Sequence, residues 1–281
     1  MYRHVVAIAA LAIVCAWGTE LVLAAQGVNN APRTGCKDLP SWDELKSALK
    51  MARAQANGGL NLDMWGTLVD RDGVVCAVAF TGTDRQQQWP GSRVISAQKA
   101  NTANAFSLPG LSLSTANLFT AVQPGGSLFG LQESNPVSTA AAYSGNPDQY
   151  GQKNDPMTGE RIGGVNVFGG GLALYNAAGK IVGGLGVSGD TSCADHNIAY
   201  RTRSTLNLDY VPAGVAAATD PTHLDNIIFD ITPQGGGDLA PSAGQMPGVS
   251  RSGFGHTSCH GYNVGGNAIS AGFAAALPPT K

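Results

Sequence analysis

The stretch "GGLGVSGDTSCADHNIAYRTR", residues 183–203, joins a glycine-rich apolar run to a polar segment of helical character. The apolar run ends at Gly189, and Ser192 then stands where a helix N-cap is expected, with Asp195 three residues later. A hydroxyl residue followed by an acidic residue at this spacing is the pattern of a capping box. The stretch therefore predicts a strand that passes directly into a well-capped helix.

The start of this helix supports two interpretations. The free backbone N–H groups and partial positive charge of a helix N-terminus can hold an anion such as a carboxylate. Gly186 and Gly189 would leave space for such a ligand. Alternatively, Ser192 simply caps the helix. The sequence leaves both interpretations open.

One side of the predicted helix carries residues that suit a haem-type ligand. At about 100° per residue, His196, Tyr200 and Arg203 fall on one side, opposite Ile198. His and Tyr are axial ligands of haem iron, and Arg pairs with carboxylates such as a propionate. This side is a ligand site only if a loop or another subunit covers it, and His196 is then the expected metal ligand.

Helix and hairpin signals alternate along residues 41–206. Ser41 and Glu44 form a capping box, and Asp72-Gly73 between two β-rich runs predicts a hairpin. The order of helix, hairpin, helices, hairpin and helix predicts an α+β domain with an antiparallel sheet flanked by helices. The expected helices are 41–57, 92–107, 113–122 and 192–206, the expected strands are 63–69, 74–81, 164–176 and 180–189, and 143–164 is a long polar loop.

The two ends of the chain differ from this domain. Residues 1–25 have the positive start, apolar core and small-residue cleavage site of a signal peptide, and residues 26–40 are an irregular lead-in. Residues 207–281 form a Gly/Pro/Ala-rich C-terminal extension that we expect to wrap the core or a neighbouring subunit. We therefore expect a periplasmic or secreted protein, with no membrane attachment beyond the signal segment.

Export would place the cysteines in an oxidising compartment. Removal of Cys15 with the signal leaves Cys36, Cys76, Cys193 and Cys259, which predicts two disulfides with three possible pairings. We favour Cys36–Cys259 and Cys76–Cys193.

The segment "GHTSCHG" contains His256, Cys259 and His260, which could ligate a metal. Structural zinc requires four ligands and only three cluster here, so a disulfide and two loop histidines are favoured.

The net charge of the chain argues against one class of partner. The 281-residue chain has a net charge of −2 and a pI near 6.2, which argues against nucleic-acid binding.

Three segments resemble the GlcG/HbpS family of small haem-binding proteins, which is related to the C-terminal domain of PduO cobalamin adenosyltransferases. They are "GTLVDRDGVVCAVAFTG", "SRVISAQKANTANAFS" and "VFGGGLALYNAAGKIVGGLGVSGDTSCADHNIA". The G-G-G and G-V-S-G motifs of the last segment are the most specific, and the resemblance covers residues 41–206.

The resemblance implies a sheet flanked by helices, assembly into homo-oligomers, and haem or a related tetrapyrrole held near subunit contacts. Some exported relatives take part in haem sensing or iron handling. On this chain the resemblance implies that the binding site includes Arg93 and Lys99, Gly169–Gly171 and the Gly189–His196 junction. With the helix face described above, the expected cofactor-binding residues are His196, Tyr200, Arg203, Arg93, Lys99, Gly170, Gly171 and Ser192.

The chain departs from the family pattern where an acidic run normally follows G-V-S-G. Cys193, Asp195 and His196 stand there, so ligation by His196 is our inference from this chain. Haem binding is therefore the expected function of this chain. Its alternatives are a sensor or accessory module for a small anionic metabolite, and a structural protein that forms an oligomer. The sequence shows no catalytic set, and any activity would be that of the haem.

Overall fold

The computed structural model describes residues 35–231, 248–259 and 266–281. The expected signal peptide over 1–25, most of the lead-in over 26–40, and His260 lie outside the described residues. Within the described ranges, no helix is long and apolar enough to cross a membrane.

The core is a four-stranded antiparallel sheet in the order β2-β1-β4-β3. Both predicted hairpins are present, and pairing of β1 with β4 joins them into one sheet. The α+β architecture predicted from the sequence is therefore confirmed. The strands are β1 (Trp65–Asp70), β2 (Val75–Phe80), β3 (Gly171–Tyr175) and β4 (Ile181–Ser188).

The strand predicted from residue 164 was too long. β3 begins only at Gly171, because Gly170 adopts a φ of +120° that is incompatible with a strand. The preceding residues are instead anchored to α2 (Ser92–Phe106), where the hydroxyl of Thr102 accepts a hydrogen bond from the backbone N–H of Asn166.

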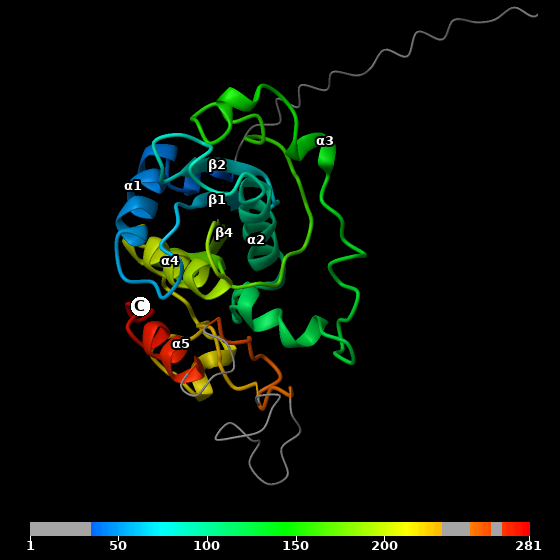
Figure 1. Ribbon diagram of the computed structural model, residues 1–281, viewed down its shortest axis with the longest axis vertical. Coiled ribbons are helices and arrows are strands. Elements are labelled where there is room, and N and C mark those ends of the chain that lie inside the picture. Colours follow the sequence, from blue (N-terminus) through cyan, green and yellow to red (C-terminus); the bar gives the residue numbers. More distant parts are fainter. Residues whose placement is uncertain (1–34, 232–247, 260–265) are drawn as a thin grey trace, which may run out of the picture. The chain divides into compact units, whose positions relative to one another are not determined.

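The helices cover both faces of the sheet (Figure 1). On one face, α1 (Trp42–Arg53) and α4 (Ser192–Thr205) pack on apolar side chains such as Leu68 and Leu185. On the other face, α2 packs on Trp65 and Val69. The alternation of strand residues between the two layers follows from the two-residue period of a strand.

Small residues allow α2 to lie very close to β4. A Cβ atom added at Gly186 would stand 1.9 Å from the carbonyl oxygen of Ser96, so only glycine fits there. Ala97, Ala100 and Ala103 are fully buried against the sheet.

Several predicted helices differ in extent. The capping box of Ser41 and Glu44 is present, but α1 ends at Arg53, because the side-chain amide of Asn57 donates to the last carbonyls of the helix. The helix predicted over 113–122 is two 3-10 turns, Thr115–Leu118 and Thr120–Val122. The polar loop contains one 3-10 turn, Pro147–Gln149, and is preceded by the short α3 (Thr139–Ala142).

The two predicted disulfides are present, but the favoured pairing was wrong. Cys36 pairs with Cys76, and Cys193 pairs with Cys259. The short 3-10 turn Cys36–Asp38 lies against the end of β1, since a Cβ at Gly35 would meet Asp70. This contact brings Cys36 beside the β1–β2 hairpin, and the C-terminal extension brings Cys259 to α4.

The described part of the C-terminal extension packs on the core, as expected. Its first residues follow the edge of the sheet, where the backbone N–H of Tyr175 donates to the carbonyl of Leu208. Its later residues, including Asp225, Asn226 and α5 (Gly266–Ala275), cover the side of α4 that faces away from α1.

Candidate functional site

A groove of about 320 Å³ lies where α2, residues 166–168 and the start of α4 meet. This volume is at the lower end of the roughly 300–1,000 Å³ found for small-molecule sites. Its rim is aromatic, because Trp89 is 51% exposed and Phe168 is 43% exposed. We call it the α2–α4 groove. Its lining residues are Trp89, Ser92, Ile95, Lys99, Asn166, Phe168, Ser188, Asp190, Ser192 and Asp195.

A buried ion pair forms the inner wall of the groove. The Lys99 Nζ atom lies 2.7 Å from the Asp195 Oδ2 atom, and both side chains are almost fully buried. Burial raises the pKa of Asp195 to about 6, although Lys99 opposes this shift. The charge of Lys99, a predicted ligand partner, is therefore already matched within the protein.

The start of α4 is capped one residue earlier than predicted. Thr191 is the N-cap, and its hydroxyl accepts from the backbone N–H of Ala194. Ser192 is the first helical residue and lines the groove. Asp195 accepts a hydrogen bond from the backbone N–H of Asp190. At the helix start itself, the backbone N–H of Cys193 donates to the sulfur of Cys259, so two of the N–H groups considered for an external anion have partners within the protein.

His196 is fully buried, because the C-terminal extension covers its side of α4. Its Nε2 atom accepts a hydrogen bond from the backbone N–H of Ile227 at 3.1 Å and also lies 3.1 Å from the Oδ1 atom of Asn226. Its Nδ1 atom has no hydrogen-bond partner in the part of the chain that is described. Burial lowers the pKa of His196 to about 3, so the imidazole is neutral at physiological pH.

Tyr200 and Arg203 lie further along the same side of α4. The ring of Tyr200 contacts those of His196 and His223, with ring centroids 5.7 and 5.9 Å apart. Arg203 forms a two-pronged ion pair with Asp225 of the extension, at 2.6 and 2.7 Å, inside the protein. Burial disfavours the charged form of Asp225, but Arg203 holds its pKa below the ordinary value. The side of the helix is thus covered, which was the condition for a ligand site.

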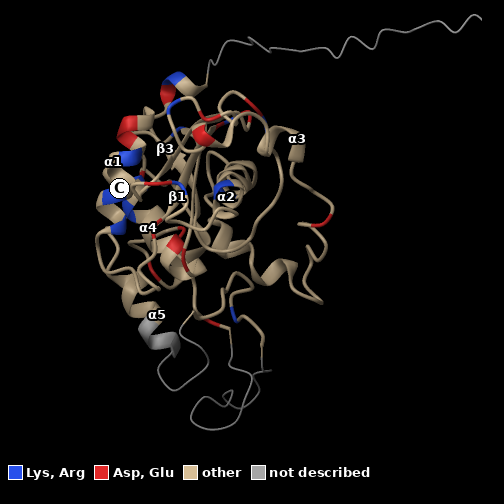
Figure 2. Cartoon of the chain, turned by 45° about the horizontal axis from the view of Figure 1, so that its top comes forward, with Lys and Arg blue, Asp and Glu red and all other residues tan. Residues whose placement is uncertain are grey.

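Arg93 does not line the groove. Its guanidinium pairs with Asp155 of the polar loop, with Nε and Oδ2 2.9 Å apart, and lies over the ring of Tyr150. In Figure 2 the Lys and Arg positions are blue, and blue is visible on α2. All three cations predicted for ligand carboxylates, Arg93, Lys99 and Arg203, therefore have buried carboxylate partners from the chain itself.

The glycines of the G-G-G motif position protein segments against each other. A Cβ atom at Gly171 would meet the side chain of Thr115 and the carbonyl of Lys99, and one at Gly170 would meet the carbonyl of Val187. Both glycines are buried. They allow the segment that precedes β3 to approach α2 and β4 closely.

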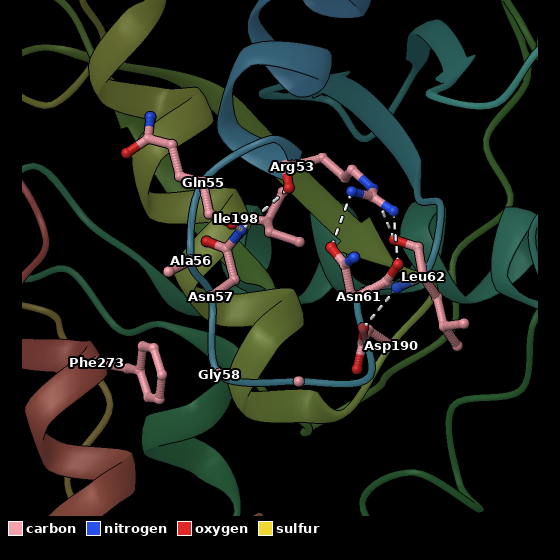
Figure 3. A pocket seen from close by; sticks show the side chains of 11 residues that line it. Arg53, Gln55, Ala56, Asn57, Gly58, Asn61, Leu62, Asp190, Ile198 and Phe273 are labelled. Atoms are coloured by element: carbon pink, nitrogen blue, oxygen red, sulfur yellow. Dashed lines mark hydrogen bonds between the residues drawn. The ribbon is translucent and has the colours of Figure 1, made fainter.

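A second pocket, of about 230 Å³, lies between the α1–β1 connection and α4 (Figure 3). Its polar groups serve the fold. Arg53 donates to the backbone carbonyls of Asn61 and Leu62, and Asp190 accepts from the backbone N–H groups of Leu60 and Leu62. These contacts hold the connection in place, so we do not assign a ligand to this pocket.

Sequence reasoning missed the partners of the predicted residues. Asp225 and Asn226 lie in a segment interpreted only as an extension, and Trp89 precedes a predicted helix without any motif. Phe168 stands directly before the G-G-G motif, which is the one signal that could have placed it near the junction. His256 was considered as a metal ligand but favoured as a loop histidine, yet it is buried and its Nε2 atom has no partner among the described residues.

A family model described as haem degrading protein HbpS-like matches residues 41–203, which is more than half of the chain. The chain belongs to the HbpS-like family. The resemblance inferred from the motifs over residues 41–206 is therefore confirmed. No curated protein matches the chain.

Two solved structures are similar to this HbpS-like chain. One is a crystal structure of a PduOC–haem complex, with 25% identity and a TM-score of 0.41, covering 59% of this chain and 91% of that chain. The other is the Klebsiella pneumoniae protein ORFY, a DUF336 protein, with 22% identity and a TM-score of 0.40, covering 58% of this chain and 86% of that chain.

The residues at the site can be compared with what haem requires. The aromatic rim of the groove suits a planar apolar ligand, and the unpartnered Nδ1 atom of buried His196 suits iron. By contrast, the described residues that line the groove include no His, Tyr or Cys and no cation other than Lys99. The fit therefore lies in the apolar rim and in the imidazole behind it, not in charge pairing with propionates.

Proposed function

We propose that this HbpS-like protein is an exported protein that binds haem or a related tetrapyrrole at the α2–α4 groove. Family membership and the aromatic rim of the groove support this function. His196 lies on the same helix as Ser192 of the groove wall, one turn further along. The observation that carries the proposal is a buried, neutral imidazole with an unpartnered nitrogen beside an open aromatic groove.

The chain's own residues would perform three tasks. Trp89, Ile95 and Phe168 would contact the macrocycle and exclude water from it. His196 would hold the iron, and Asn226 would fix the orientation of its ring, as partners of metal-ligating histidines do. When bound, haem would supply an iron centre that can take a ligand or exchange an electron. A role in haem sensing or iron handling is compatible with these tasks.

Titration of the purified full chain with haemin tests the proposal. We expect a Soret band that saturates at a fixed ratio of haem to protein. Replacement of Trp89 or Phe168 by alanine should weaken binding about tenfold, since each removes an aromatic contact of roughly 1.4 kcal/mol. Phe129→Ala is the matched control, because Phe129 is 67% exposed and does not line the groove. Absence of saturable binding would overturn the proposal.

The alternative of a small anionic metabolite at the α4 N-terminus is not favoured, because the backbone N–H of Ala194 donates to Thr191 and that of Cys193 to the sulfur of Cys259. Calorimetry with small hydroxy acids in place of haemin tests this alternative directly. Heat from a hydroxy acid and none from haemin would favour it.

We also propose that the protein is exported and assembles into a homo-oligomer. The two disulfides are compatible with an oxidising compartment, and the oligomer follows from the family resemblance. Fractionation of the native host tests the location, and light scattering of the purified chain tests the assembly. A monomeric mass would count against the oligomer, including the structural alternative in which the extension builds the assembly.

A further inference from the structure

The two disulfides of the chain have opposite electrostatic surroundings. The Cys36–Cys76 bond lies beside Asp70, with one carboxylate oxygen and the two sulfur atoms all within 4.8 Å of one another. The Cys193–Cys259 bond lies at the start of α4, where Cys193 is the second helical residue. A carboxylate disfavours a thiolate beside it, whereas a helix N-terminus stabilises one. The two bonds should therefore differ in how readily they are reduced.

Hydrogen-bond donors contact the sulfur atom of Cys259. The backbone N–H of Cys193 donates to it at 3.1 Å. The Ser192 hydroxyl lies 3.4 Å from the same sulfur and is the donor, because a bonded sulfur carries no hydrogen. Cys76 has the opposite kind of neighbour, since its sulfur lies 3.4 Å from the carbonyl oxygen of Val74. A thiolate of Cys259 would therefore be solvated by the protein, whereas one at Cys76 would face an acceptor.

The carboxylates near the start of α4 are compensated by other groups. Asp195, the acidic residue of the first turn, pairs with the Lys99 Nζ atom at 2.7 Å. The carboxylate of Asp190 accepts hydrogen bonds from the backbone N–H groups of Leu60 and Leu62 in the α1–β1 connection. These contacts limit the negative potential that the two carboxylates exert on the disulfide, so the stabilising effect of the helix start remains.

An external thiolate reaches this bond through Cys259, which is partly exposed, because Cys193 is only 2% exposed. Attack on the Cys259 sulfur breaks the bond to Cys193, forms a mixed disulfide and releases Cys193 as a thiolate. The second sulfur of a dithiol then attacks the reductant's own sulfur in the mixed disulfide and releases Cys259. Two electrons pass to the cysteines, the dithiol becomes a disulfide, and its two protons go to the cysteine sulfurs or to solvent. A more stable leaving thiolate speeds this exchange.

The bond also attaches the C-terminal extension to the core covalently. It joins residues 248–259 to α4. The same segment contacts the core without covalent bonds, because the hydroxyl of Thr120 donates to the carbonyl of Gly255 and the ring of Phe119 lies 4.7 Å from that of His256 between centroids. Opening the disulfide would leave the segment held by contacts of this noncovalent kind.

We propose that the Cys193–Cys259 bond is a site of thiol–disulfide exchange with a dithiol reductant, and that its redox state controls how firmly residues 248–259 are attached to α4. The Cys36–Cys76 bond, beside Asp70, is the bond that persists. This inference goes beyond haem binding and does not depend on it.

Reduction of the oxidised full chain with dithiothreitol, followed by alkylation with iodoacetamide and peptide mass spectrometry, tests the exchange site. We expect Cys193 and Cys259 to be reduced about tenfold faster than Cys36 and Cys76. Equal rates, or faster reduction of Cys36 and Cys76, would overturn the proposal.

Hydrogen exchange tests the control of the extension. In the chain reduced only at Cys193 and Cys259, amide exchange of residues 248–259 should become faster, and exchange of the β1–β2 hairpin should not change. Unchanged exchange of residues 248–259 would show that the bond does not control the attachment of the extension.

Asp70→Asn tests the electrostatic cause. It removes the charge beside Cys36–Cys76 and should speed the reduction of that bond about threefold, with no change at Cys193–Cys259. Asp72→Asn is the matched control, because Asp72 lies in the same turn but is exposed and outside the cluster with the sulfur atoms. Equal rates in Asp70→Asn and the wild type would contradict the proposed cause. If Asp70→Asn does not fold, the rates of the two bonds in the wild type still decide.

Discussion

The two sides of α4 are packed by different chemistry. Toward α1 and the sheet, Ile198 and Ala199 join a cluster of leucine, valine and alanine side chains. Toward the C-terminal extension, His196 meets Asn226 and Arg203 meets Asp225 inside the protein. An apolar contact tolerates many partners, whereas a buried polar group requires one specific partner. The extension side of α4 is therefore the specific and vulnerable side.

The largest effect is expected from breaking the Arg203–Asp225 pair. Arg203→Met would leave the Asp225 carboxylate buried without a counter-charge, at a cost of about 3–5 kcal/mol in the free energy of unfolding. Urea denaturation monitored by circular dichroism measures this change. Lys153→Met is the control, because Lys153 and Asp43 form an exposed pair worth about 0–1 kcal/mol. Equal effects of the two variants would show that the extension side is no more specific than the surface.

The close packing of α2 on the sheet can be compared with this buried ion pair, because it involves no charged groups. Gly186→Ala would place a methyl group 1.9 Å from the Ser96 carbonyl, and forcing α2 outward should destabilise the protein by about 3 kcal/mol. Gly272→Ala in α5 is the control, because nothing lies within 4 Å of an added Cβ and alanine favours a helix by about 1 kcal/mol. Opposite signs in thermal unfolding are expected, and a tolerated Gly186→Ala would contradict the close packing.

The buried histidines should make the protein sensitive to acid. The pKa values of His196 and His256 are lowered to about 3 and 4, so between pH 4.5 and 6 only the unfolded state takes up their protons, and stability falls as the pH falls. Asp195, with its pKa raised to about 6, acts in the opposite direction in this range. The net uptake of about one proton gives a loss of about 1.4 kcal/mol per pH unit.

Urea denaturation at pH 4.5, 5, 5.5 and 6 measures this slope. His256→Gln should abolish most of it, because the uptake by His196 and the opposite effect of Asp195 then nearly cancel. His223→Gln serves as the comparison. A slope that is unchanged in His256→Gln would mean that His256 is not buried in its neutral form.

The smallest effect concerns the start of α4. Thr191→Ala should cost about 1 kcal/mol, as the loss of an N-cap usually does. Ser192→Ala should change stability by less than about 0.5 kcal/mol, because the Ser192 hydroxyl is 3.4 Å from Cys259 Sγ and does not cap the helix. Differential scanning calorimetry measures both, and the reverse order would restore Ser192 as the cap.

The fold was largely predictable because its signals are local. The capping box of Ser41 and Glu44, the Asp72-Gly73 turn and the alanines of α2 each act within a few residues of sequence. The errors arose where a distant segment intervenes. Hydrogen bonds to α2 shorten the run before β3, and the docking of Cys259 on α4 decides the disulfide pairing.

The candidate site was predictable only in part. Periodicity placed His196, Tyr200 and Arg203 on one side of one helix, and that side is covered as the ligand hypothesis required. The same reasoning assigned Arg93, Lys99 and Arg203 to a ligand without their partners. Those partners, such as Asp155 and Asp225, lie 62 and 22 residues away from Arg93 and Arg203 in the chain.

The sequence by itself determined the two hairpins and the three long helices of the core, their order and the family, because turn, cap and periodicity signals depend on neighbouring residues. Only the tertiary structure decided which charges are paired, which cysteines are bonded and that His196 and His256 are both buried. These outcomes depend on contacts between residues far apart in the chain, which are set by the packing of the C-terminal extension on α4.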